Sequence, residues 1–353
     1  MTVIQQESED NPVNQDETPQ TNQELSLQVT HLGSLPEAVS NNAVVEGFID
    51  NIPYIFSFGG IDETKLYSGI HKRSYRYNIQ TGEAQEIPDL PDTMGKIGSA
   101  ASRIGNIIYI SGGYYVFSNN SEITSGKMHR YDIINNEYLE DAPDIPVPTD
   151  DHVQAVWRDL LIYLITGWNN TANIPNVQIY NPTTNSWLSG TPVPNNSYRS
   201  FGASGTIIGD TIYYFGGATS DTGFGIQNQL RIGRINPDNP TEITWETTTP
   251  NATINGYRMA ATSVNGQPHW IGGSKNTYNF DGIAYDGSGG VPTAKRDLYT
   301  DTSTIQWQEI IQSQLPMDLR GIASISDTIK YLAGGMLDNQ QVSNAIYKLE
   351  WSN

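Results

Sequence analysis

The chain has 353 residues, of which 16% are charged, and its formal net charge is −19 at pH 7. An acidic balance of this size argues against nucleic acid and anionic membrane surfaces as partners, because both require a basic face on the protein. The absence of cysteine excludes disulfides, zinc–thiolate sites and thiol catalysis.

Residues 1–24 are polar, contain six Asp and Glu residues and lack Lys and Arg. They have neither the basic n-region nor the apolar h-region of a signal peptide, and we predict a disordered acidic tether ahead of one domain over residues 25–353. No run of about 18 apolar residues predicts a transmembrane helix. We expect a monomer in the periplasm or on the cell surface, with the signal or lipid anchor upstream of this chain, and a cytoplasmic location stays open.

One phrase recurs along the rest of the chain: a short hydrophobic strand that ends in a glycine pair or a close variant of it. Its six copies end at Gly60, Gly113, Gly167, Gly217, Gly273 and Gly335. The copies lie 50 to 62 residues apart. A period near 50 residues is typical of an array in which each repeat forms one four-stranded blade.

The other strands of each repeat are predicted from their spacing to the glycine pair. A hairpin turn with residues such as Asn265-Gly266 comes before the pair, and such residues supply the positive φ of a tight turn. A strand with tyrosine and a strand with tryptophan follow it. In VQIYNPTTNSWLSG, the spacing from Tyr180 to Trp187 predicts that both rings meet between blades.

The glycine pair, the tyrosine and the tryptophan six or seven residues later resemble the kelch family over residues 25–351. The resemblance implies an all-β fold, a six-bladed kelch-type β-propeller. Departures are visible: Thr166 replaces the first glycine in blade three, and Ala84 stands where blade one should have tryptophan. Glycine at the pair is interpreted as a requirement of backbone packing against the neighbouring blade, and not as a phosphate cradle.

The sixth repeat ends one strand short, after Ala345–Trp351. The segment Leu25–Leu32 alternates like a strand and precedes the first blade. We predict that it is the outer strand of blade six, so that an N-terminal strand closes the ring and removes an exposed edge. Kelch propellers are similar in this closure.

Two kinds of loop share one face of a propeller, one before each innermost strand and one after each glycine pair, and a channel mouth there is a natural pocket. Blades four and five share Tyr198-Arg199 and Tyr257-Arg258 before their inner strands. We expect cationic or titratable residues from five blades to surround the mouth and to bind an anionic ligand: Lys96, His152, Arg199, Arg258 and Arg320. In the alternative, these side chains pair with local acids, namely Asp150, Asp151 and Asp318.

Aromatic residues near the same loops offer stacking faces for a sugar ring, with loop packing as the alternative. The predicted stacking residues are Tyr115, Trp168, Tyr198, Phe224 and Tyr257. No metal site or cofactor is predicted, because the five histidines share no loop and form no i,i+4 pair. A plain loop is expected over Asn279–Gly290, and calcium binding is the alternative, because the loop has oxygen ligands although its spacing does not match an EF-hand.

Three functions compete at this stage. The leading one is a module that binds an anionic glycan or an acidic peptide at the channel mouth. The second is sialic acid mutarotation, since bacterial N-acetylneuraminate epimerases are six-bladed kelch propellers that this chain resembles at a distance. Such an enzyme needs an acid and a base, for which Asp151 and His152 are the candidates. The third is a propeller that binds other proteins and has no small ligand.

Overall fold

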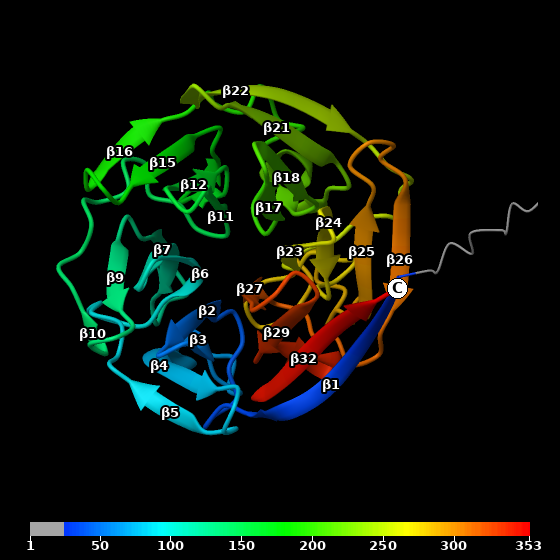
Figure 1. The fold of residues 1–353 in the computed structure, drawn as a ribbon. Helices are drawn as coiled ribbons and strands as arrows, with labels where there is room; N and C mark the ends of the chain where they lie inside the picture. Colours follow the sequence, from blue (N-terminus) through cyan, green and yellow to red (C-terminus); the bar gives the residue numbers. More distant parts are fainter. Residues whose placement is uncertain (1–24) are drawn as a thin grey trace, which may run out of the picture.

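The computed structural model describes residues 25–353, and the predicted tether over residues 1–24 lies outside the described residues. Six antiparallel sheets are arranged as blades around one axis, with the innermost strand of each blade facing the axis (Figure 1). The predicted all-β, six-bladed β-propeller is therefore confirmed. Within residues 25–353, no helix is long and apolar enough to cross a membrane.

Each blade runs outward from the axis in four main strands. Blade one contains β2 (Ala43–Ile49), β3 (Ile52–Ile61), β4 (Ile70–Asn78) and β5 (Ala84–Ile87), and blade two contains β6 (Ile97–Ile104), β7 (Ile107–Val116), β9 (Met128–Asp132) and β10 (Glu137–Tyr138). Blade three contains β11 (Val153–Trp157), β12 (Leu161–Ile165), β15 (Val177–Asn181) and β16 (Ser186–Ser189), and blade four contains β17 (Ser204–Ile208), β18 (Thr211–Phe215), β21 (Leu230–Asn236) and β22 (Asn239–Thr248). Blade five contains β23 (Ala260–Val264), β24 (Gln267–Ile271), β25 (Arg296–Thr300) and β26 (Trp307–Ile311), and blade six contains β28 (Ala323–Ser324), β29 (Ile329–Ala333), β32 (Ala345–Ser352) and β1 (Ser26–Ser34).

Short elements decorate the face that carries the long loops. β8 (Glu122–Thr124) adds to β7, and β27 (Arg320–Gly321) pairs in parallel with β2. Three two-stranded hairpins follow the glycine pairs of blades three, four and six: β13 (Trp168–Asn169) with β14 (Ala172–Asn173), β19 (Ala218–Thr219) with β20 (Gly225–Ile226), and β30 (Met336–Leu337) with β31 (Gln341–Val342). Single 3-10 turns complete the loops: η1 (Tyr67–Gly69), η2 (Ser220–Thr222) and η3 (Asp338–Gln340).

The ring closes as the sequence predicts. β1 pairs antiparallel with β32 along its length, with Leu27 opposite Trp351, and becomes the outermost strand of blade six. The side chains of Leu27 and Trp351 are buried between blades five and six. The first described strand and the last strand therefore complete one sheet and cover its edge.

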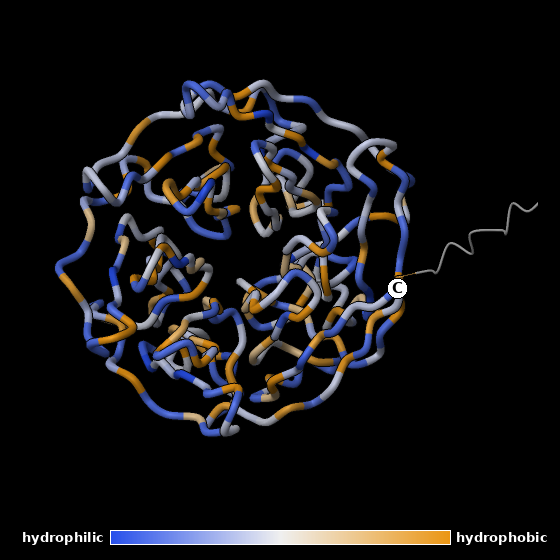
Figure 2. Tube along the Cα trace, viewed as in Figure 1, coloured by the Kyte–Doolittle hydropathy of each residue, from blue (hydrophilic) through white to orange (hydrophobic). Residues whose placement is uncertain are grey.

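The hydrophobic core is divided among the blade interfaces. Hydrophobic and hydrophilic residues are interleaved along the strands of all six blades (Figure 2), and the buried ones form a separate cluster at each interface between neighbouring blades. At one of these interfaces, the ring centroids of Tyr180 and Trp187 lie 5.2 Å apart, which confirms the predicted contact.

The glycine pairs have the structural role that the sequence indicates. A Cβ on Gly112 would lie 2.0 Å from the carbonyl oxygen of Thr149, at the start of the next blade, and Gly112 has a φ of +61°. A side chain is therefore excluded there by both space and backbone conformation.

Candidate functional site

A closed ring of hydrogen bonds, all but one of them between backbone groups, surrounds the axis where the inner strands begin. Its members occupy the same position of the six repeats and all have positive φ: Asn41, Gly98, Asp151, Gly202, Arg258 and Asp318. We call this set the axial ring. The N–H of each of Asp151, Gly202 and Arg258 donates to the carbonyl oxygen of the member before it, at 2.8 to 2.9 Å. Asn41 N–H donates to the Asp318 carbonyl, and the Asn41 side chain accepts from Gly98 N–H. Leu319 N–H, next to Asp318, donates to the Arg258 carbonyl at 3.0 Å, which closes the ring around six blades.

The side chains of the axial ring meet in a buried ion network across the axis. Arg258 of blade five donates to Asp151 Oδ2 of blade three at 2.6 Å and to Asp318 Oδ1 of blade six at 3.1 Å. Arg320 reaches from β27 to the His152 carbonyl at 2.9 Å, and its Nη1 lies 3.5 Å from Asp151 Oδ1. We call the four charged residues Asp151, Arg258, Asp318 and Arg320 the axial network.

The charges in the axial network depend on one another. Burial alone would raise the pKa of Asp151, but Arg258 and Arg320 outweigh burial and hold that pKa below its usual range. Burial wins at Asp318, where the pKa is raised despite Arg258 and a hydrogen bond from Ser40. Asp151 is therefore ionised and lies between the guanidinium groups of Arg258 and Arg320, which makes it a poor proton acceptor.

A pocket of about 170 Å³ opens on the loop face directly above this network. We call it the mouth pocket. The residues that line it are Tyr114, Glu122, Asp150, Asp151, Trp168, Asn170, Phe201, Phe224, Arg258, Asn279 and Tyr285. Aromatic rings dominate its wall, and they contact one another, with Trp168 5.7 Å and Tyr285 4.8 Å from Phe224 between ring centroids.

Two carboxyl groups of the mouth pocket have raised pKa values. Burial, followed by the charge of Asp151, raises the pKa of Asp150 well above its usual range, although Thr124 donates to Asp150 Oδ2 at 2.7 Å. Burial also raises the pKa of Glu122, although much of that side chain is exposed, and the positive charge of Arg258 lowers that pKa by less. The pKa values of the neighbouring residues Asp150 and Asp151 are thus shifted in opposite directions. Asp150 favours the protonated acid, and Asp151 favours the ionised carboxylate.

The long loop of blade five covers part of the mouth. Asn279 and Tyr285 from this loop line the pocket, while Phe280 packs with Ile61 and Tyr114 of blades one and two. The loop therefore spans from its own blade toward the opposite side of the axis. Sequence patterns miss this placement, because the path of a long loop is fixed by contacts that lie far away in the sequence.

The loop Asn279–Gly290 has no cluster of acidic ligands. Asp281 and Asp286 each accept a hydrogen bond from a backbone N–H two residues later, at 3.0 and 2.9 Å. Among the residues that the structure describes, no three His, Asp or Glu side chains gather in a way that would hold a metal ion. Calcium binding by this loop stays an untested alternative.

Lys96 does not reach the mouth. Its side chain is buried, and Nζ lies 2.8 Å from Asp92 Oδ2 and 3.1 Å from His129 Nε2, inside blade two. Burial lowers the pKa of Lys96, and Asp92 opposes that shift. This lysine stabilises the blade. It lines neither the mouth pocket nor a second pocket that lies on the axis below the axial network, between the inner strands.

Tyr198 and Arg199 also lie away from the mouth. Tyr198 ends a turn in which its N–H donates to the Asn195 carbonyl, and its ring packs between blades three and four near Trp245. Arg199 is half-buried and lines neither axial pocket. The residue of blade four that corresponds to Arg258 is Gly202, and not Arg199.

The other predicted residues lie near the axis but on different levels. Trp168 lines the mouth pocket, and Tyr257 is buried behind its wall, with the Arg258 guanidinium carbon 5.2 Å from its ring centroid.

His152 turns the other way, with Nε2 3.0 Å from Ser111 Oγ, and lines the channel below the network together with Arg320. Burial and Arg320 lower the pKa of His152 to about 3, so this imidazole is neutral. Asp151 and His152 therefore do not converge on one ligand.

The expected positive rim is wrong as a geometric prediction. The five cationic or titratable residues occupy different positions of the repeat, and the two arginines on the axis are paired with Asp151 and Asp318. The shared Tyr-Arg dipeptide was misleading, because Gly202 and Arg258 each precede the second glycine of their pair by fifteen positions, whereas Arg199 precedes it by eighteen. Counting back from the glycine pair would have matched Gly202 of blade four, and not Arg199, to Arg258 of blade five.

The fold and this axial site define a β-propeller with a ligand-sized pocket at its loop face. No family model matches the sequence. The chain is 28% identical over 171 residues to Kelch-like protein 36 of Mus musculus, a match that covers 48% of this chain and 26% of that protein. It is 29% identical over 196 residues to Kelch-like protein terF of Aspergillus terreus, covering 53% of this chain and 40% of that protein.

The chain thus matches less than half the length of these relatives. Among solved structures, that of YjhT superposes with a TM-score of 0.71 at 14% identity, covering 91% of this chain and 99% of the other, which shows the shared fold. Together with the repeat pattern, these matches show that the chain is similar to kelch proteins and has the six-bladed β-propeller fold.

Proposed function

We propose that this kelch propeller is a binding module that takes a small ring-bearing ligand, a neutral or amino sugar, into the mouth pocket. The observation that carries the proposal is the combination in one pocket of an aromatic wall with carboxyl and amide side chains. Trp168, Phe224 and Tyr285 offer faces for the C–H surface of a sugar ring. Glu122, with Asn170 and Asn279, offers hydrogen-bond partners for its hydroxyl groups.

The charge of the pocket favours a ligand without negative charge. Arg258 is the cationic residue among those that line it, and its guanidinium is already paired with two carboxylates. An anionic glycan or an acidic peptide would have to compete with Asp151 and Asp318 for that group and approach Glu122. We therefore replace the anionic ligand expected from the sequence by a neutral or cationic one at this pocket.

A glycan array followed by calorimetry on the best sugar tests the proposal. Trp168→Ala should weaken binding by on the order of tenfold through loss of a stacking face. Tyr67→Ala is the matched control, because Tyr67 is an exposed aromatic residue of the blade-one loop and lines neither axial pocket. A preference for sialylated glycans or acidic peptides, or equal binding by the Trp168 variant, would overturn the proposal.

A second candidate is anomer exchange of a bound sugar, as the resemblance to N-acetylneuraminate epimerases suggests. Its support is the pair of mouth carboxyl groups with raised pKa values. Asp150 is held as an acid that can protonate the ring oxygen, and Glu122 can accept the proton of the anomeric hydroxyl while the bond from the anomeric carbon to the ring oxygen breaks. These two residues replace Asp151 and His152 as the candidate acid and base.

NMR exchange spectroscopy on glucose, an amino sugar and sialic acid separates this candidate from simple binding. Catalysis requires that the wild-type protein speeds anomer exchange and that Asp150→Asn and Glu122→Gln remove the acceleration, with sugar binding retained. Binding without acceleration leaves the module as a pure receptor.

The remaining expectations are proposals of the same kind. A propeller that binds other proteins and no sugar would give an empty glycan array and a protein partner on the loop face. Location in the periplasm or at the cell surface is tested by fractionating cells that express the native gene. Size-exclusion chromatography with light scattering tests the monomeric state.

A further inference from the structure

The axis contains a second pocket on the other side of the axial network. It encloses about 260 Å³ and is lined by residues from the inner strands of all six blades. We call it the channel pocket, and no residue lines both it and the mouth pocket. Hydroxyl and amide side chains face it from successive blades: Ser102, Gln154, Ser204, Thr206, Thr262 and Ser324.

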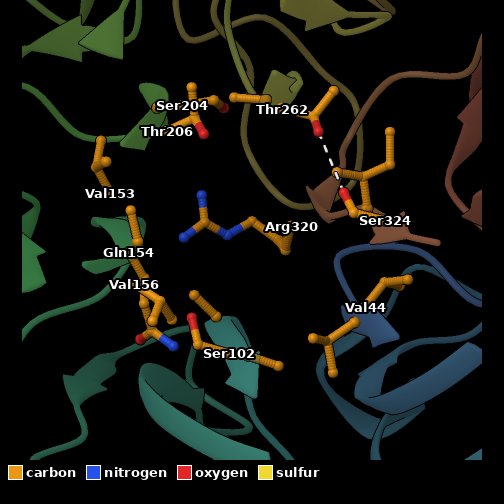
Figure 3. Close-up of a pocket in the computed structure, with 18 of the residues that line it drawn as sticks. Val44, Ser102, Val153, Gln154, Val156, Ser204, Thr206, Thr262, Arg320 and Ser324 are labelled. Atoms are coloured by element: carbon orange, nitrogen blue, oxygen red, sulfur yellow. Dashed lines mark hydrogen bonds between the residues drawn. The ribbon is translucent and has the colours of Figure 1, made fainter. Parts of the chain in front are cut away.

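The guanidinium of Arg320 lies in the middle of these side chains (Figure 3). The residue is 6% exposed, and it comes from blade six, while its nearest polar partners belong to blade three on the opposite side of the axis. Its charge therefore lies on the axis at the closed end of the channel pocket.

Arg320 is incompletely satisfied by the protein. Of the five donors of a guanidinium, Nη2 donates to the His152 carbonyl, and Nη1 lies 3.5 Å from an Asp151 oxygen. Nε has no hydrogen-bond partner among residues 25–353. Arg258 also has an unpartnered Nε, but two carboxylates and the rings of Tyr257 and Tyr278 compensate its charge.

Among the residues that line the channel pocket, the His152 carbonyl is the acceptor to which Arg320 donates. The Thr262 and Ser324 hydroxyls bond to each other at 3.1 Å and, like the other hydroxyls, can donate as well as accept. The acids of this pocket are Glu46 and Asp159. Glu46 accepts from Ser324 N–H and lies 3.5 Å from Arg103 Nε, while Asp159 is exposed beside the β11–β12 turn. Buried donors without acceptors are costly, so an acceptor from solution is favoured here.

We propose that the channel pocket is a binding site for a small oxyanion, a carboxylate or a phosphate, held by the Arg320 guanidinium and by surrounding hydroxyl groups. The planar fork of arginine matches two oxygens of such a group. The ligand enters from the face that carries the hairpin turns, because the axial network closes the channel toward the mouth. This site is separate from the sugar pocket and places the anion recognition expected from the sequence on the other side of the network.

Calorimetric titration with inorganic phosphate and with acetate, at ionic strength fixed with sodium chloride, tests the site and separates the two kinds of oxyanion. We expect saturable binding of at least one of them to the wild-type protein, and a melting temperature that rises with its concentration. Arg320→Gln should weaken binding by on the order of tenfold or more.

Arg234→Gln is the matched control, because Arg234 forms an exposed ion pair with Glu246 far from the axis. Trp168→Ala should leave anion binding unchanged, which keeps this test independent of the mouth pocket. Equal binding by the Arg320 variant, or a wild-type response no larger than that to chloride alone, would overturn the proposal.

A selenate soak of wild-type crystals covers the case in which Arg320→Gln does not fold. An anomalous peak within hydrogen-bond distance of the Arg320 guanidinium supports the site, and a channel pocket without such a peak contradicts it.

Discussion

The mouth pocket and the channel pocket lie on one axis and differ in origin. The mouth pocket is built mainly from long loops, which differ from blade to blade. Its wall combines aromatic rings with acidic side chains. The channel pocket is built from inner strands, which repeat, and hydroxyl and amide side chains surround Arg320 in it. Loops therefore supply asymmetry and strands supply a uniform wall, and the axial network keeps the two environments apart.

Removing the closing strand should have the largest effect, because both pockets depend on an intact ring. Deletion of residues 1–34 removes β1 and the buried Leu27 from the interface of blades five and six. A buried leucine alone contributes about 2 to 5 kcal/mol, and the lost strand pairing adds to this. Thermal melting should show a large drop for this deletion and little change for deletion of residues 1–24. Similar melting temperatures for both would contradict the role of β1.

Breaking the axial network should come next. Arg258→Met leaves Asp151 and Asp318 buried without their shared cation, and loss of one partner of a buried pair costs about 3 to 5 kcal/mol. Urea denaturation measures the loss. Arg234→Gln, which removes an exposed pair, should change the free energy of unfolding by about 1 kcal/mol or less. If both variants lose the same small amount, the network does not hold the two pockets apart.

Gly202 holds the blade-four position of the axial ring, which the sequence pattern had assigned to Arg199, and a substitution there tests how tightly the ring is packed. It has a φ of +63°, and a Cβ there would lie 2.3 Å from Tyr257 Cε2. Gly202→Ala should cost about 2 to 4 kcal/mol, because strain in the backbone adds to the clash with a buried ring. Gly105→Ala is the control, since Gly105 has a φ of +60° with nothing within 4 Å of the added Cβ, and it should cost about 1 kcal/mol. An equal cost in both variants would show that the axial ring imposes no packing constraint.

The last expected effect is a change in pH dependence through His152. Its pKa is lowered to about 3, so between pH 3 and 6.5 the unfolded chain binds a proton that the folded protein does not. The contribution of His152 to stability should therefore rise with pH across this window, by at most about 1.4 kcal/mol per pH unit for one proton, while the raised pKa values of Asp150, Asp318 and Glu122 contribute with the opposite sign. His152→Gln should flatten the profile, measured by denaturation from pH 4 to 7. Part of the slope should remain, because burial also lowers the pKa of His71, to about 4. An unchanged slope would contradict a neutral, buried His152.

The repeat made most of the fold predictable from the sequence. Each glycine pair fixes the end of a strand, six copies fix the number of blades, and the missing strand after Ala345–Trp351 predicts the partner of β1. These features are local or repeated, so an error in one blade is corrected by the others. The pairing of Tyr180 with Trp187 followed from the same spacing argument.

The site was less predictable because it depends on single positions and long loops. Arg199 resembles Arg258 in its dipeptide but lies three positions before the true equivalent, Gly202. Glu122, Asn279 and Tyr285 come from loops whose paths the repeat does not fix. Arg320 was predicted near the axis, yet it extends into the channel pocket, because a side chain of that length can cross from blade six to blade three.

The pairing of β1 with β32 also has a consequence for the order of folding. Ser26 and Ser352 contact each other across a sequence separation of 326 residues. During synthesis, β1 cannot join blade six until the ribosome has released β32, more than 300 residues later. Contacts this distant form late, and unpaired strand edges attract other chains in the meantime. We therefore expect the nascent chain to be most prone to aggregation just before β32 emerges, and the pairing of β1 with β32 to complete the sheet and end that exposure.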